Sequence, residues 1–469
     1  MDRLHRCEKA KGVRRIGGAA RGLVLLTCIA SAVAWLLAPS AAHAVPSFAR
    51  QTGAACAVCH TVFPELTPFA RIFKLNGYTL SGTEQLEEPG TEHVPPLEIN
   101  RVLPLAVMLQ TSLTRTNRQQ AGTQNVNVEF PQELSLFLAG EITHHIGTFL
   151  QVTYTGTDDH FSIDNTDIRY ANQVLVQGKE LAYGITINNN PTLEDLWNST
   201  PAFSFPFATA DSSPAPAAAA IIDGTLAQQV AGVGAYARWN RQFYGDVTLY
   251  RSAHIGSPQP PTSAAGSTIR DVAPYWRFAW ENTWGANYLE VGTLGMFAQL
   301  FPNAVSGPAD KFTDIGFDSQ YERPIGDDSV SAHALYIFEN QNLGATNAAG
   351  NSSRRTDKLH TLRLDGIYHW RSRVTCSLVY FLIHGSSDQA LYAPKSVSDD
   401  PAQVTGSSTG SPNSDGAVAE IAYRPWWNVR LSIQYTAYAQ FNGRSHNYNG
   451  TGRDAADNDT LFLLAWLAF

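Results

Sequence analysis

Apolar and polar side chains alternate along most of the chain, from about Leu103 to Phe469. The alternation recurs in runs of about ten to fourteen residues, a length that suits strands crossing a membrane. In one such run Leu431, Ile433 and Tyr435 are separated by polar residues. Because successive side chains of a strand point to opposite faces, each run predicts a strand with one apolar and one polar face.

About sixteen strands are predicted, and the connections between them alternate in length. The strand centres fall near residues 110, 137, 150, 170, 184, 234, 247, 277, 292, 317, 335, 363, 379, 420, 434 and 464. The short connections are His144-His145, Gln177 to Lys179, Asn240-Arg241, Trp284-Gly285, Arg323 to Asp328, Arg371-Ser372 and Pro425 to Asn428. The long connections are 118–131, 191–227, 254–271, 342–356, 386–413 and 442–457. This arrangement is typical of outer-membrane porins, so residues 100–469 are predicted to form an all-β, transmembrane antiparallel barrel.

A soluble β-sandwich or propeller is the alternative to a barrel. The sequence has no visible repeat of propeller-blade length, and a sandwich would not alternate its loop lengths so regularly. Closing the sheet also removes unpaired strand edges, which hydrocarbon does not tolerate. An even number of strands would place both ends of the barrel on the short-turn side, the periplasmic side.

Residues 1–44 have the layout of a secretory signal peptide. A basic start precedes the apolar run Gly22–Ala38, and Ala42-His43-Ala44 then offers small residues for cleavage. We therefore expect the mature chain to begin at Val45. An uncleaved membrane anchor is the alternative, because the apolar run is only slightly shorter than a membrane span.

The net charge argues against one class of partner. The whole chain has a formal net charge of −8. Residues 1–44 contain seven basic and two acidic side chains, so the remainder carries −13. An acidic surface argues against nucleic-acid binding and mildly favours cationic partners.

Cys56-Ala57-Val58-Cys59-His60 is the attachment signature of a c-type haem. Two thiols three residues apart on a helical turn can reach both vinyl groups of one porphyrin, and the following histidine can bind the iron. A zinc site would need a second cysteine pair, which the exported part of the chain does not supply. The motif predicts one covalent haem c, with thioethers from Cys56 and Cys59 and His60 as the proximal iron ligand. The haem-binding segment is predicted at 45–95, too short to enclose the group alone, so the barrel lumen or its periplasmic mouth must supply the second wall.

The residues around this motif resemble the fused cytochrome–porins of bacterial outer membranes. The similarity is carried by Val45–Gly53, Phe63–Phe69 and Phe73–Tyr78 and covers roughly residues 45–80. The family includes proteins assigned to extracellular iron(II) oxidation. The resemblance implies electron transfer across the outer membrane, between an extracellular donor or acceptor and a periplasmic carrier such as a soluble cytochrome. It does not fix the donor.

Two other functions remain open at this stage. The first is a diffusion porin in which the haem is a redox sensor or gate. The second is a small-molecule haem enzyme, which would need an open position on the iron. Met108 and His145 are candidates for the sixth iron ligand; the alternatives are a lipid-facing apolar residue for Met108 and a surface turn for His145.

Three further features carry hypotheses. Asp158-Asp159-His160 with Asp164 offers oxygen and imidazole ligands for a divalent ion such as iron(II), although a solvated acidic loop has the same composition. The loop 191–227 is too rich in aromatic residues to lie in water, so we predict that it folds into the pore. Those aromatic residues are Trp197, Phe203, Phe205 and Phe207. Cys376 is predicted to be an unreactive strand residue.

Overall fold

The computed structural model describes residues 46–80, 85–120, 123–253, 267–394 and 405–469. All of them belong to one compact unit, Ala42–Phe469. The predicted signal peptide, residues 1–44, lies outside the described residues.

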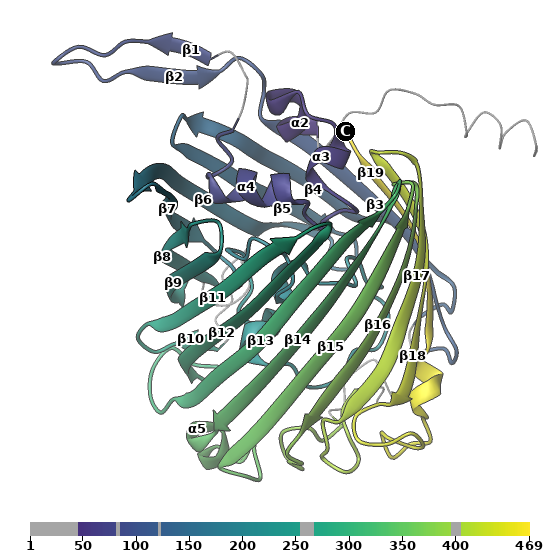
Figure 1. Cartoon of the computed structure of the whole chain (residues 1–469). Coiled ribbons are helices and arrows are strands. Elements are labelled where there is room, and N and C mark those ends of the chain that lie inside the picture. Colours follow the sequence, from purple (N-terminus) through teal and green to yellow (C-terminus); the bar gives the residue numbers. More distant parts are fainter. Residues whose placement is uncertain (1–45, 81–84, 121–122, 254–266, 395–404) are drawn as a thin grey trace, which may run out of the picture. The chain divides into compact units, whose positions relative to one another are not determined.

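Sixteen antiparallel strands close into a barrel (Figure 1). The barrel strands are β3 (Leu105–Thr116), β4 (Asn127–Thr143), β5 (Ile146–Thr155), β6 (His160–Val176), β7 (Lys179–Asn188), β8 (Val230–Trp239), β9 (Phe243–Ser252), β11 (Ala273–Trp284), β12 (Asn287–Phe301), β13 (Asp310–Ile325), β14 (Asp328–Asn342), β15 (Thr356–Trp370), β16 (Val374–Gly385), β17 (Ser414–Trp426), β18 (Val429–Gln440) and β19 (Thr460–Ala468). Closure is made by β19 pairing with β3, and the two-residue strand β10 (Thr268–Ile269) pairs beside β12. Every predicted strand centre falls within one of these sixteen strands, so the predicted fold class is confirmed.

The strand ends differ from the prediction where pairing continues past the apolar run. The predicted turn Arg323 to Asp328 is shorter in the structure, because Arg323 pairs with Val330 and Ile325 pairs with Asp328. Similarly, β4 begins at Asn127, inside the predicted loop 118–131. Both extensions include a proline, Pro131 in β4 and Pro324 in β13, a residue more typical of turns than of strands.

The two faces of the wall follow the predicted alternation. On β18 the side chains of Leu431 and Ile433 face outward and are 42% and 59% exposed, whereas Arg430 and Gln434 face inward and are buried. The barrel therefore has an apolar outer surface and a polar lumen, the arrangement of an outer-membrane barrel. Among the described residues, no helix is both long enough and apolar enough to cross a membrane.

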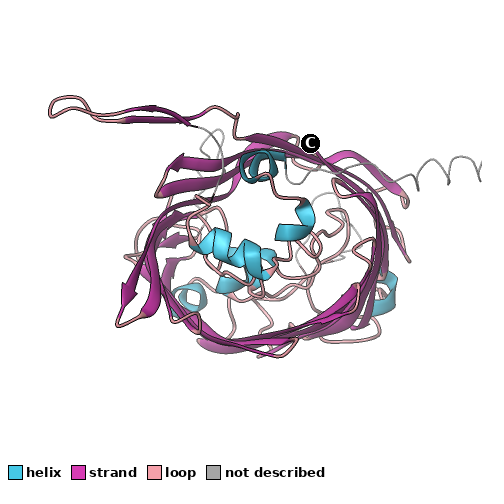
Figure 2. Cartoon of the chain, turned by 45° about the horizontal axis from the view of Figure 1, so that its top comes forward, coloured by secondary structure: helices cyan, strands magenta, loops and turns pink. Residues whose placement is uncertain are grey.

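Three short helices lie inside the barrel wall at the short-turn end (Figure 2). They are α2 (Pro46–Thr52), α3 (Cys56–Cys59) and α4 (Pro68–Leu75). Helix α4 begins at Pro68, and the Thr67 hydroxyl caps it by accepting a hydrogen bond from the Ala70 amide. Gly77 follows its end with φ +66°, a left-handed conformation that glycine adopts without strain.

The remaining elements lie in loops or outside the wall. A hairpin of β1 (Gln85–Glu88) and β2 (Leu97–Asn100) projects away from the barrel, and the sequence did not predict it (Figure 1). The loop elements are η1 (Pro201–Phe203), η2 (Ile221–Thr225), α5 (Gly344–Ala348) and η3 (Ala455–Asn458).

Candidate functional site around the Cys56–His60 motif

Helix α2 is fastened to the lumen face of β4 by Gln51. The Gln51 amide donates to the carbonyl oxygen of Ala139 at 2.9 Å, and its oxygen accepts from the amide of Glu141 at 3.1 Å. The residue between them is Gly140, where an added Cβ would lie 2.4 Å from the Gln51 oxygen. Glycine is therefore what lets the helix approach the strand this closely.

Helix α4 and the residues after it reach other parts of the wall. Arg71 forms a two-pronged ion pair with Glu322 of β13, with N–O distances of 2.5 and 3.1 Å. The hydroxyl of Tyr78 donates to Asp167 of β6 at 2.7 Å. Because α2, α4 and Tyr78 bind different strands, the helical segment is held across the lumen rather than tethered at one point.

His60 follows α3 and has one ring nitrogen already engaged. Its Nδ1 lies 3.2 Å from the carbonyl oxygen of Glu65, which leaves Nε2 for a ligand. Desolvation by burial lowers the pKa of His60 to about 4. The imidazole is therefore neutral at physiological pH, the form that binds a metal.

Two barrel histidines hold Glu65. Its carboxylate lies 3.0 Å from Nε2 of His369 and 3.7 Å from Nε2 of His333. His333 is held in turn by Asp365, at 2.6 Å from Nδ1. Burial would raise the pKa of Glu65, but the two imidazoles hold that pKa well below its usual range. The carboxylate is thus ionised, and the wall fixes the residue whose carbonyl orients His60.

Cys59 and His60 border a cavity of about 310 Å³ inside the lumen. Most of its lining is aromatic or aliphatic. The aromatic members are Phe48, Phe63, Phe73, Tyr78, Phe137, Phe149, Phe203, Phe207 and Trp466. Aromatic and aliphatic walls suit the apolar faces of a porphyrin, and the volume is at the lower end of pockets that hold cofactors.

Cys56 lies beside this cavity rather than on its wall. Its side chain is fully buried and packs with Ala49, Phe63, Trp427 and Trp466. Among the described residues, no disulfide involves Cys56, Cys59 or Cys376. A thioether from Cys56 would require its thiol to leave this cluster and reach the cavity, whereas Cys59 and His60 already line it.

The two candidate sixth ligands occupy different places. Met108 is 6% exposed and lines the same cavity as His60, so it does not face lipid. His145 is exposed on the turn between β4 and β5, where its Nδ1 lies 3.1 Å from the carbonyl oxygen of Ala171. Only Met108 of this pair is on the cavity wall.

The loop between β7 and β8, residues 189–229, folds into the lumen as predicted. Trp197 and Phe205 are 1% and 2% exposed, and Phe203 and Phe207 line the cavity. The deep end of the loop is fixed to the wall, because the amide of Ile221 donates to Glu339 at 2.7 Å. The composition of the loop had indicated this burial, but not its polar partners.

A buried ion network joins this loop to strands β11, β12 and β13 of the wall. Arg277 is fully buried and lies within 3.2 Å of carboxylate oxygens from Asp195, Glu290 and Asp318. Asp195 belongs to the loop, and its carbonyl oxygen accepts from the ammonium of Lys74 on α4 at 2.6 Å. Loop, helix and wall are therefore one connected structure.

The hypothesis of a metal site at Asp158, Asp159, His160 and Asp164 is wrong. Asp159 binds the hydroxyl of Tyr154 at 2.6 Å in the loop, whereas Asp164 lies within β6 and accepts from Thr153 at 3.0 Å. Among the residues that the structure describes, no three His, Cys, Asp or Glu side chains are grouped to hold a metal ion. Cys376, by contrast, is the strand residue predicted, on β16.

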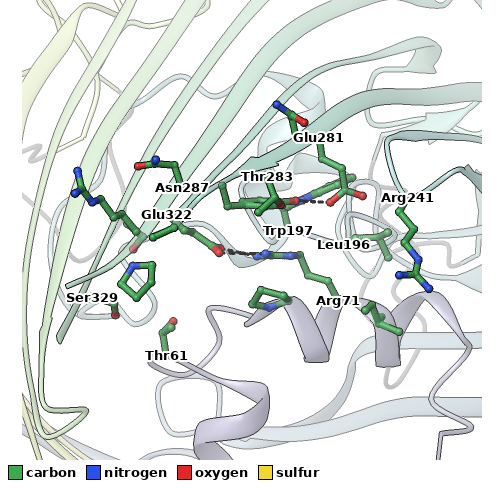
Figure 3. A pocket seen from close by; sticks show the side chains of 18 of the residues that line it. Thr61, Arg71, Leu196, Trp197, Arg241, Glu281, Thr283, Asn287, Glu322 and Ser329 are labelled. Carbon is green, nitrogen blue, oxygen red and sulfur yellow. Dashed lines mark hydrogen bonds and ion pairs between the residues drawn. The ribbon is translucent and has the colours of Figure 1, made fainter. Parts of the chain in front are cut away.

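A second, larger cavity of about 870 Å³ borders the other side of the motif segment (Figure 3). Thr61, Glu65 and Arg71 line it, together with the short turns around Arg241 and Gly285. The Arg71–Glu322 pair crosses this cavity, as the dashed lines in Figure 3 mark. His60 and Leu66 line the smaller cavity, whereas Thr61 and Glu65 line the larger one, so residues 60–66 lie between the two cavities.

Neither a protein-family model nor a curated protein matches this chain. Solved structures of similar fold include the outer-membrane channel DcaP of Acinetobacter baumannii, at 13% identity and a TM-score of 0.45 over 78% of this chain and 96% of that one. An anion-selective porin from Comamonas acidovorans gives 12% identity and a TM-score of 0.45, over 78% and 98% of the two chains. OmpT of Vibrio cholerae gives 11% identity and 0.40, over 78% and 96%. Scores this low carry no functional argument, and the barrel is established by its own strand pairing.

Proposed function

We propose that this protein is an electron conduit of the bacterial outer membrane, a porin-like barrel that carries one covalent haem c in its lumen. The observation that carries the proposal is the position of His60 and Cys59 on the wall of an apolar cavity inside the barrel. The apolar exterior supports a position in the membrane, and the resemblance of residues 45–80 to fused cytochrome–porins supports the cofactor. The haem would supply one-electron chemistry through its iron.

The chain's own residues would position and insulate this group. Cys59 and Cys56 would anchor the porphyrin, and His60 would bind the iron through Nε2 while Glu65 fixes its ring. The aromatic lining would exclude water, and a dry, low-dielectric site tunes the reduction potential of a haem.

Seating the haem in the lumen addresses a problem of distance. The apolar band of such a barrel is about 25 Å tall, a long way for an electron to cross protein unaided. A cofactor inside the lumen would split this distance into two shorter electron-transfer steps, and a freely tethered cofactor outside the barrel would not. The 870 Å³ cavity beyond residues 60–66 gives a periplasmic carrier, such as a soluble cytochrome, an approach from the short-turn end.

The alternative function is a diffusion porin with a haem as redox sensor or gate. A porin needs an open lumen, but here the loop 189–229 and helices α2 to α4 lie across it. This arrangement argues against free diffusion of solutes through the lumen. We infer inward flow, from an extracellular reductant such as iron(II), because the resemblance leans that way and the net charge of −13 suits a cationic donor.

Liposomes that enclose a redox dye provide the test. With the protein inserted, external iron(II) should change the dye without itself crossing, and His60→Ala should abolish that response while the barrel still assembles. A sugar-leakage assay on the same vesicles measures solute flux. Free leakage of sugars, with a dye response only to reductants that permeate, would show a porin instead of a conduit.

The proposed orientation places the short turns in the periplasm. An epitope tag inserted after Gly350, in the exposed loop following α5, should be labelled on intact cells. A tag after Gly90, between β1 and β2, should be labelled only after the outer membrane is opened. Heat-modifiable migration on a gel is the control that both tagged barrels are folded. The reverse labelling pattern would overturn the orientation.

A further inference from the structure

We propose that the thioether of Met108 would bind the haem iron as a second protein ligand, together with His60. The inference rests on the proposed function, since it requires a haem in the 310 Å³ cavity. It assigns a ligand-binding role to a barrel-wall residue, so that the iron would join the helical segment to the wall.

The first observation is the face on which Met108 lies. Residues of β3 alternate strictly, and Ala106, Met108 and Gln110 all point inward and line the cavity. An apolar side chain gains nothing from this polar face unless it packs against an apolar partner there. Met108 is 6% exposed and belongs to the lining of the cavity.

The second observation is a polar contact on the sulfur. The amide nitrogen of Gln110 lies 3.7 Å from Sδ of Met108, within the range of a weak hydrogen bond to a thioether. A thioether has two lone pairs, so one can accept from the amide while the other binds iron. Gln110 is 3% exposed, so this donor is buried beside the sulfur.

The other side chains on this wall that could bind iron are committed elsewhere. The ammonium of Lys74 donates to the carbonyl oxygen of Asp195 at 2.6 Å, and the hydroxyl of Tyr78 donates to Asp167 at 2.7 Å. His145 is not part of the lining. Glu133 and Asp164 lie on the wall, but hard carboxylate oxygens are poor partners for a haem that must cycle through iron(II), which a soft thioether stabilises.

Methionine and histidine ligation would suit the proposed function. This ligand pair raises the reduction potential, as in soluble cytochromes c. It also fills both axial positions, which leaves no site for a substrate. Ligation by Met108 would therefore distinguish an electron carrier from a small-molecule haem enzyme, which needs an open position on the iron.

The test compares Met108→Leu with Met296→Leu in the full-length haem protein. Leucine is close in volume to methionine, so the barrel should fold in both variants. Met296 is the matched control, because it is the other methionine of the chain after residue 44 and is buried in a separate cluster with Leu294 and Tyr275. The readouts are the absorption and electron paramagnetic resonance spectra of the oxidised protein, carbon monoxide binding to the reduced protein, and the reduction potential.

The wild type and Met296→Leu should show the thioether-to-iron charge-transfer band and a low-spin iron that does not bind carbon monoxide. Met108→Leu should lose the band, bind carbon monoxide and have a lower potential, while its haem stays covalently attached on a denaturing gel. Unchanged spectra in Met108→Leu would overturn the inference, as would a wild type that binds carbon monoxide freely. A wild type without haem staining would instead overturn the proposed function itself.

Discussion

Replacing both Cys56 and Cys59 with alanine is expected to abolish haem staining on a denaturing gel. Each thioether is a covalent bond that survives denaturation, so the double variant should fall to background and either single variant should stain more weakly than wild type. Cys56 is fully buried among Ala49, Phe63 and the tryptophans Trp427 and Trp466, so its truncation should also cost about 1 kcal/mol of packing. That loss is small beside the stability of a closed barrel.

Cys376→Ser is the matched control for this experiment. Cys376 is exposed on β16 and lies outside the cavity lining, so the variant should keep its full haem content. Heat-modifiable migration on a gel reports whether each barrel is assembled. Normal haem staining in the double variant, with its barrel intact, would rule out the motif as an attachment site.

The strands were predictable because the sequence of each strand alternates according to which side chains face lipid and which face the lumen. A wall residue faces either lipid or lumen, so the alternation at Leu431, Ile433 and Gln434 needs no knowledge of the neighbouring strand. The projecting hairpin β1–β2 was not predicted, because its two strands have only four residues each, much shorter than the runs that marked the wall.

The contacts of the site were not predictable in the same way. Glu65 is held by His333 and His369, which lie more than 260 residues further along the chain. Such pairs depend on the register of distant strands, which a single sequence does not give. The position of Met108 could have been predicted from the sequence. Met108, Gln110 and the polar residues that follow occupy alternate positions of β3, so they lie on the same face of the strand, the lumen face.

Excising residues 190–227 is expected to convert the protein into a solute channel. The two ends of this loop already meet, because the amide of Gln228 donates to the carbonyl oxygen of Asn189 at 2.9 Å. A short Gly-Ser turn joining Asn189 to Gln228 would therefore keep β7 and β8 in register. Arg277 would retain Glu290 and Asp318 after losing Asp195, so its buried charge stays compensated.

Flux of small sugars through the excised variant should rise from baseline toward that of an open sixteen-stranded porin. The path would run beside α4, through the 870 Å³ cavity at the short-turn end. Excision of α5, Gly344–Ala348, is the matched control, because this helix lies in an outer loop and should leave flux unchanged. Flux that stays at baseline would show that helices α2 to α4 close the lumen without the loop.

The loop-excised variant also tests whether the loop shields the haem from water, independently of haem attachment. Cys56, Cys59 and His60 are untouched, so the haem should remain covalent, but the cavity would lose Leu193, Phe203 and Phe207 from its wall. Water would then reach the group, and carbon monoxide binding or a changed potential should report it. A reductant that permeates the new channel would reduce the enclosed dye directly, so the dependence of the dye response on His60 should disappear. If that dependence persists while sugars pass freely, electrons and solutes cross the barrel by separate routes, and the loop is not the insulator.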